Sequence, residues 1–242
     1  MVLYVMRREI SMLIDTVGAS TVIDSLIRSR RTVRAFRPAP VSRGDLVEIL
    51  EVARMAPSTF NTQPWQVHLL TGAAKCELSK AILQAHAANT QPVFSPFPDP
   101  PPVACAARQN DFGRRYYGSL GIDRADRPAR ARQTGRNFLF FDAPVGLIFT
   151  IDAALTKHSW LDFGLFLQSL MLAAHARGLA TCPQVAFVWY ESVISKHLAL
   201  GAEERVVCGM SLGYADEDAP VNKSLMPREP LGQFTRWLGF DE

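Results

Sequence analysis

Residues 143–178 read APVGLIFTIDAALTKHSWLDFGLFLQSLMLAAHARG, and this stretch carries the two elements that decide the fold. Its first part, APVGLIFTID (143–152), is a short continuous apolar run, which predicts a strand buried on both faces. Its second part (159–178) is apolar nearly all round and predicts a central core helix with Gly178 as its C-cap. Asp162, Gln168 and His175 interrupt that helix, which argues against a membrane span.

Helices and strands alternate on both sides of this centre. The apolar spacing predicts helices at 21–29, 42–56, 73–89 and 190–200, and strands within 61–72, 179–188 and 204–215. Ser42 and Asp45 form a variant of the capping box at the start of the second helix, which ends at Ala56-Pro57. A proline-rich loop (91–103) and two basic, aromatic helices (104–121 and 125–141) do not suit a regular doubly wound sheet. We therefore predict an α+β fold with a mixed sheet flanked by helices.

The bulk composition is that of an ordinary globular protein. Of the 242 residues, 48% are hydrophobic and 20% charged, and the net charge of +3 is too small to indicate nucleic-acid binding. The cysteines are widely spaced without a C-x-x-C pair, so we expect no zinc site and four reduced thiols in a cytoplasmic protein: Cys76, Cys105, Cys182 and Cys208. Residues 1–19 lack the order of a signal peptide, and we interpret them as an N-terminal extension.

The sequence lacks the common catalytic and nucleotide-binding motifs. It contains no G-x-G-x-x-G, G-x-x-x-x-G-K-[ST], G-x-S-x-G or H-E-x-x-H. The five histidines lie in helix or strand patterns with no obvious acidic or cysteine partner. We therefore assign no catalytic side chain and no metal ligand.

Two short stretches are rich in polar chemistry. SRRTVRAF (29–36) gathers Arg30, Arg31 and Arg34 around Thr32, and guanidinium forks match phosphate oxygens. Charge alone leaves a solvated basic turn open as the alternative. APSTFNTQPW (56–65) offers hydroxyls and amides in a loop between a helix and a strand, which suits a heterocycle edge or a phosphate but also ordinary turn chemistry.

Taken together, four segments in register resemble the FMN-dependent nitroreductase family. They are RSRRTVRAFRPAPV with the following ARMAPSTFNTQPWQV, then GLFLQSLMLAAHARGLATCPQ, and finally VVCGMSLGYADEDAPVNKSLMPREPLGQF. The segment RQTGRNFLFFDAPVGLIFTID and the C-terminal tail are most similar to the nitrobenzoate or nitrophenol reductase subgroup. The resemblance covers about residues 21–240. It implies one nitroreductase-like domain at 20–242, with a lid-like insertion at about 90–140.

The resemblance also implies an intertwined homodimer with two FMN sites at the interface. By position it assigns the binding of the FMN phosphate, the ribityl chain and part of the ring to Arg30, Arg31, Thr32 and Arg34. The loop contributed by the other subunit corresponds to Pro57, Ser58, Thr59, Asn61 and Gln63, and the segment beside the flavin ring to Pro183, Gln184 and Val185. Arg228 corresponds to a C-terminal basic residue that also reaches the phosphate. Thr32 replaces a frequent serine, Phe60 fills a slot that is often small or polar, and Gln184 stands where several members carry glutamate.

The implied activity is ping-pong transfer of electrons from NADH or NADPH through FMN to a nitroaromatic compound or a quinone. Other flavin chemistry on the same fold (reductive dehalogenation, ene reduction or flavin breakdown) and a non-enzymatic FMN-binding redox module remain the alternatives. Candidates for lining the substrate slot are Phe97, Tyr116, Tyr117 and Phe138, and ordinary packing is the alternative role for each of them. The tail carries Phe234, Trp237 and Phe240, which need a surface to bury them, such as a partner subunit. We expect no nucleic-acid and no membrane partner.

Overall fold

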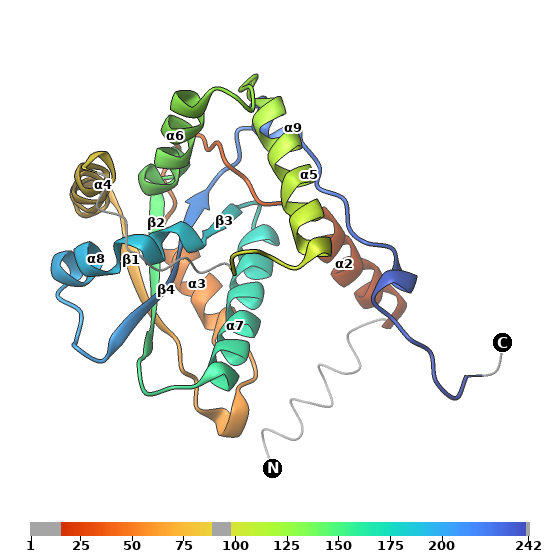
Figure 1. Ribbon diagram of the computed structural model, residues 1–242. Coiled ribbons are helices and arrows are strands. Elements are labelled where there is room, and N and C mark those ends of the chain that lie inside the picture. Colours follow the sequence, from red (N-terminus) through yellow and green to blue (C-terminus); the bar gives the residue numbers. More distant parts are fainter. Residues whose placement is uncertain (1–15, 89–97, 241–242) are drawn as a thin grey trace, which may run out of the picture.

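The computed structural model describes residues 16–88 and 98–240 (Figure 1). The predictions for residues 1–15, for Phe97 and for most of the proline-rich loop lie outside the described residues. The predicted boundary at residue 19 falls inside the first described helix, α2 (Thr16–Ser29).

Four strands form one sheet in the order β1-β2-β4-β3. Their bounds are β1 (Gln66–Leu70), β2 (Val145–Asp152), β3 (Ala180–Gln184) and β4 (Glu204–Gly213). All three strand pairings are antiparallel. Within the described ranges, a parallel pairing occurs as the isolated bridge between Thr32 and Thr181. The α+β class is confirmed, and the mixed character of the sheet is limited to the extended segment around Thr32.

Helices cover both faces of the sheet, as Figure 1 shows. The helical elements are α3 (Arg43–Ala53), η1 (Thr59–Asn61), α4 (Gly72–Ala87), α5 (Val103–Ser119), α6 (Arg127–Gly135), η2 (Arg136–Asp142), α7 (Lys157–His175), η3 (Val185–Tyr190), α8 (Glu191–Leu198), α9 (Pro220–Lys223) and η4 (Leu231–Gln233). The predicted cap of α3 is confirmed, because the Ser42 hydroxyl accepts from the Asp45 N–H at 3.0 Å and donates to its carboxylate at 2.7 Å.

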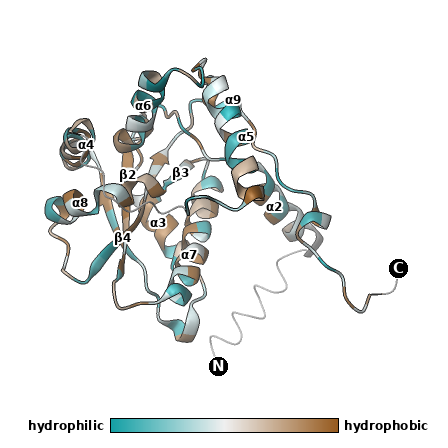
Figure 2. Cartoon of the chain, viewed as in Figure 1, coloured by the Kyte–Doolittle hydropathy of each residue, from teal (hydrophilic) through white to brown (hydrophobic). Residues whose placement is uncertain are grey.

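The side chains on the two faces of β2 belong to two different hydrophobic clusters, as its continuous apolar sequence predicts. Residues of α3 and α7 pack with the first face of β2 and with β4, whereas α4, α8, η2 and η3 pack on the other face. Val145 and Leu147 belong to the first cluster and Ile148 to the second. Figure 2 shows hydrophobic residues concentrated on the strands, while α6 is largely hydrophilic.

Two predicted elements are shorter in the structure. The helix expected at 125–141 stops at Gly135 and continues as η2, where Phe140 and Phe141 adopt positive φ values of 53° and 51°. Both rings are buried against the sheet, and this packing outweighs the local helix pattern. The strand expected at 179–188 ends at Gln184, because the chain then turns to bury Phe187 and Tyr190.

The hairpin of α5 and α6 is present as predicted, and its first helix lies beside α9 and the C-terminal segment (Figure 1). After α9 the described chain extends along the side of the molecule that carries α2 (Figure 1). Among the residues that the structure describes, no helix combines the length and the apolar character needed to cross a membrane.

Candidate active site

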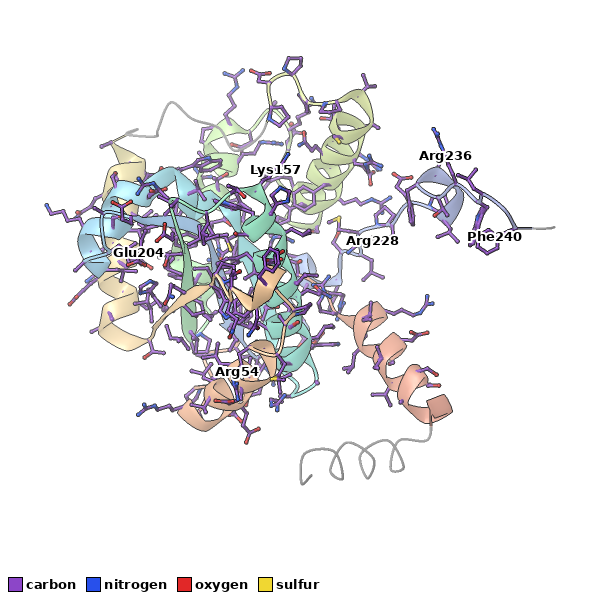
Figure 3. The ribbon with its side chains drawn as sticks, turned by 90° about the horizontal axis from the view of Figure 1, so that it is seen from below. Arg54, Lys157, Glu204, Arg228, Arg236 and Phe240 are labelled. Carbon is purple, nitrogen blue, oxygen red and sulfur yellow. The ribbon has the colours of Figure 1, made fainter. Side chains whose placement is uncertain are left out.

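A cleft of about 900 Å³ brings the N-terminal arginine cluster together with the C-terminal segment. It is lined by residues from α2, the extended segment after it, α5, α7 and the chain from α9 onward: Ile27, Arg28, Arg30, Arg31, Thr32, Arg34, Phe112, Gln168, Asn222, Ser224, Leu225, Met226 and Arg228. Of the predicted cofactor-binding residues, the structure thus unites Arg30, Arg31, Thr32, Arg34 and Arg228 in one place. Figure 3 shows Arg228 where the C-terminal segment leaves the body, with Arg236 and Phe240 farther along the arm.

The arginine segment is held in position by its neighbours in the fold. Helix α2 ends at Ser29, whose hydroxyl contacts the Nε2 atom of His175 at 2.8 Å. The next residues run beside the start of β3, where the Val33 N–H donates to the Thr181 carbonyl at 3.1 Å. Val33 is buried, and in an extended chain its neighbours point to the opposite side. Thr32 and Arg34 therefore face the cleft.

The C-terminal segment returns to the same region through backbone pairing. Phe36 and Ala215 form an antiparallel bridge, the Arg37 N–H donates to Tyr214, and the Asp216 N–H donates to Ala35 at 3.0 Å. These contacts bring chain segments that lie about 180 residues apart in sequence into register. They bring the C-terminal segment to the region where Arg228 and the arginine cluster line the same cleft.

The cleft is strongly electropositive. Five arginines line it, and the described lining residues include no aspartate or glutamate. Arg31 pairs with Glu217 at 3.3 Å outside this lining. Burial and the positive charge of Arg228 lower the pKa of Arg30, so these two guanidinium groups repel each other. An anion would relieve that repulsion, and guanidinium groups bind phosphate bidentately.

An aromatic pair of α5 borders the cleft. Arg34 lies over the rings of Phe112 and Tyr116, with its central carbon 5.3 Å and 5.0 Å from the ring centroids. The two rings stack at 5.4 Å. The Tyr116 hydroxyl accepts from the Gln133 amide at 2.7 Å, which ties α5 to α6. Arg34 thus connects the arginine segment to the hairpin through cation–π contacts.

The other slot candidates have different surroundings. Tyr117 lines a separate cavity of about 570 Å³ within the hairpin, where Arg130 lies 3.9 Å from its ring centroid. Phe138 is fully buried and makes edge contacts with Phe187 and Tyr190, so it is a packing residue.

The loop at 57–63 lies apart from the cleft. Pro57, Ser58, Thr59, Asn61 and Gln63 do not occur among the described residues that line it. Thr59 donates from its N–H and hydroxyl to the buried carboxylate of Asp162, at 3.0 and 3.2 Å, near the start of α7. The arginine segment contacts the other end of the same helix, where Ser29 meets His175. The 13 residues from Asp162 to His175 correspond to about 20 Å of helix, which separates the loop from the arginine segment.

This loop is strained and rigidly held. Phe60, Asn61 and Gln63 have positive φ values of 49°, 58° and 47°, and Phe60 is 98% exposed. The Gln63 N–H donates to the Ser58 hydroxyl at 3.0 Å, and the Gln63 amide donates to the Asn61 carbonyl at 3.2 Å. Strained residues that project into solvent from an ordered loop indicate a functional contact.

The third predicted segment lies at the end of β3. Gln184 is buried, its amide donates to the Asn137 carbonyl at 2.7 Å, and it accepts from the Ser211 hydroxyl at 2.8 Å. Its side chain is therefore engaged inside the fold, while Pro183 is half-buried and Val185 exposed. β3 begins beside Thr32 and ends about 10 Å away at Gln184, a span that suits an elongated ligand.

The described residues hold no group of acidic, histidine or cysteine side chains that could bind a metal ion. Burial raises the pKa of Cys182 and of Cys208 to about 12, so neither provides a thiolate at neutral pH. All four cysteines are unpaired.

Sequence reasoning missed Phe112 and Asn222. Phe112 had a readable signal, because it precedes Tyr116 by four residues on a basic helix, the spacing of one helix face. Asn222 had none, since all of the partners of its side chain but the Asp216 carbonyl lie about 190 residues away along the chain.

Comparisons with known proteins find similar sequences and similar structures. The sequence model of the Nitroreductase family matches residues 27–214. The chain is 51% identical to a 4-nitrobenzoate reductase of Pseudomonas putida over 90% of its own length and 96% of that protein. It is 42% identical to a nitrobenzene nitroreductase of Ectopseudomonas oleovorans over 90% and 98%, respectively.

Solved structures of proteins described as nitroreductases are also similar to this chain. The FMN-dependent nitroreductase NfnB from Mycobacterium smegmatis, in complex with NADPH, superposes with a TM-score of 0.87 at 33% identity, covering 91% of this chain and 99% of that one. The FMN- and NADPH-dependent NfnB from a Sphingopyxis strain gives 0.86 at 35% identity, covering 90% and 99%.

Proposed function

This chain belongs to the nitroreductase family, and we propose that it is an FMN-dependent oxidoreductase that passes electrons from NADH or NADPH to nitroaromatic compounds or quinones. The observation that carries the proposal is the cleft in which Arg30, Arg34 and Arg228 converge without a lining carboxylate. Relatives named as reductases of nitrobenzoate and nitrobenzene make nitroaromatic acceptors the first choice.

The residues of the cleft fit FMN. A phosphate monoester carries close to two negative charges at neutral pH, and Arg30 and Arg228 supply two cations whose mutual repulsion it would relieve. Thr32 adds a hydroxyl on the same face. The cleft volume of about 900 Å³ lies in the range of cofactor sites. We assign the phosphate end to these residues and the ring end to Pro183, Gln184 and Val185.

When bound, FMN supplies the redox chemistry, accepting a hydride from the nicotinamide and delivering electrons to the acceptor. The chain's own residues have the task of binding and orienting. The arginines neutralise the phosphate, and the stacked Phe112 and Tyr116 hold the side chain of Arg34. Because electron transfer through a flavin needs no protein nucleophile, the two buried, protonated thiols and the lack of a catalytic motif are consistent with this activity.

We also infer that the active form is a homodimer. Large apolar side chains stand exposed on the first half of α7, on α2, in the strained loop and on the C-terminal arm: Trp160, Leu161, Leu165, Val22, Ile23, Ile27, Phe60, Phe234, Trp237 and Phe240. Such a surface needs a partner to exclude water from it. A second copy would cover it and would bring its own loop 57–63 to the cleft, which accounts for the projecting Phe60.

The cytoplasmic location remains a proposal, supported by four cysteines without a disulfide.

A purified preparation tests the proposed activity. We expect a yellow protein whose absorbance is bleached by NADH or NADPH under anaerobic conditions and restored by 4-nitrobenzoate or a quinone. A colourless protein that takes up no added FMN would refute the flavin assignment. A yellow protein that the nicotinamides cannot bleach would favour the redox module. Bleaching without recovery by nitroaromatics or quinones would direct attention to the other flavin reactions.

A further inference from the structure

Asn222 makes an unusually complete set of long-range hydrogen bonds. It is 5% exposed and lies in the short helix α9. Its side-chain oxygen accepts from the Arg34 N–H at 2.8 Å, and its amide nitrogen donates to the carbonyls of Ala35 and Asp216, each at 2.8 Å. Its own carbonyl accepts from the Arg31 guanidinium at 3.0 Å. Both amide hydrogens and the amide oxygen are therefore in use.

These bonds join the two segments that carry the arginines of the cleft. On one side Asn222 holds the backbone of Arg34 and the side chain of Arg31. On the other side it holds the turn at Asp216 and precedes Arg228 by six residues of the same C-terminal segment. Arg228 itself bonds only to the nearby carbonyls of Met226 and Pro227 among its contacts in the described chain. Its position relative to the arginine cluster therefore depends on how this segment is anchored.

We propose that Asn222 is a positioning residue for the phosphate end of the cofactor, which sets the spacing of Arg31 and Arg34 against Arg228. This inference rests on the proposed FMN-dependent function. Few side chains can replace it, because the site needs two donors and one acceptor at fixed directions. Aspartate keeps the acceptor but loses both donors and places a negative charge beside the arginines; serine is too short to reach all three partners.

The test compares two ligands that differ only in the phosphate. FMN and riboflavin are titrated into apoprotein of the wild type and of Asn222→Ser and Asn222→Asp, and binding is followed by quenching of flavin fluorescence. Asn110→Ser and Asn110→Asp are the matched controls, because Asn110 is an exposed residue of α5 whose side chain makes no hydrogen bond among the described contacts. Circular dichroism and the melting temperature of each apoprotein report folding.

We expect Asn222→Ser to raise the dissociation constant of FMN about tenfold to a hundredfold and that of riboflavin by less than about threefold. Asn222→Asp should lose more FMN affinity than Asn222→Ser, since its carboxylate competes with the phosphate for the arginines. The Asn110 variants should match the wild type with both ligands.

Four results would overturn the proposal. Equal loss of affinity for FMN and riboflavin would mean a general structural role, and so would variants that do not fold. If folded Asn222 variants bind FMN as tightly as the wild type, Asn222 does not position the phosphate-binding arginines, and the proposed function is unaffected. A wild-type protein that binds no FMN would instead refute the proposed function, and the inference with it.

Discussion

Replacement of Arg228 by alanine tests the phosphate assignment with little disturbance of the fold. Arg228 is exposed, and its described hydrogen bonds go to the carbonyls of Met226 and Pro227 at 3.1 and 3.2 Å, two residues and one residue away, respectively. Removing the guanidinium therefore breaks local contacts on a surface segment. We expect the melting temperature of the apoprotein to stay within about 2 °C of the wild type, as for most surface substitutions.

The effect on FMN binding should be much larger. A charge-assisted hydrogen bond to phosphate contributes about 1.5–3 kcal/mol, and each 1.4 kcal/mol changes a dissociation constant about tenfold. The loss of repulsion on Arg30 offsets part of this, because the positive charge of Arg228 helps to lower the Arg30 pKa in the absence of an anion. We therefore predict a dissociation constant for FMN about tenfold to a hundredfold above that of the wild type.

Fluorescence titration of apoprotein with FMN at several salt concentrations measures this change. Arg236→Ala is the matched control, since Arg236 lies on the same exposed arm and its removal changes the net charge equally (Figure 3). Arg228→Lys should recover part of the affinity by keeping the charge without the bidentate fork. If Arg228→Ala binds FMN as tightly as the wild type, or if Arg236→Ala weakens binding to the same extent, Arg228 does not bind the phosphate.

Three further predictions concern the loop, the arm and the first residue of β4. Asp162→Ala removes both acceptors of Thr59 and should lower the free energy of unfolding by about 1–3 kcal/mol in a urea titration; an unchanged midpoint would show that the loop is held by other contacts. Deletion of residues 232–242 should weaken the proposed dimer in sedimentation velocity, because the arm carries exposed aromatic side chains; a fully dimeric truncated protein would show that the arm does not hold the two subunits together. The pKa of Glu204 is lowered below its usual 4.5, chiefly by the hydrogen bond that the Thr150 hydroxyl donates to its carboxylate. The stability that this carboxylate contributes is therefore present above that value and is lost as the pH falls through the lower folded pKa. Glu204→Gln should therefore flatten the decline of the melting temperature between about pH 5 and pH 3, and an equally steep decline in the variant would contradict this.

The central elements could be predicted because their signals are local. The apolar run at 143–152 and the helix that follows it have a hydrophobic pattern that fixes their type within a few residues. Ser42 and Asp45 marked the start of α3 for the same reason, since a capping box closes within one turn.

The ends of elements were predicted less well where burial competed with local preference. The residues after Gly135 continue a helical pattern, yet the structure turns them into η2 so that Phe138, Phe140 and Phe141 can reach the core. No window of sequence around these residues contains the strands against which they pack.

The sequence by itself determined where the candidate binding residues gather: the cluster of Arg30, Arg31 and Arg34, and a polar loop after α3. Only the tertiary structure decided that Arg228 and that cluster line one cleft, and that Asn222 holds the two segments together over a separation of 188 residues. The physical reason is the range of the interactions involved. Propensity and periodicity act between residues a few positions apart, whereas the hydrogen bonds of a single buried amide exist only after the whole chain has folded around it.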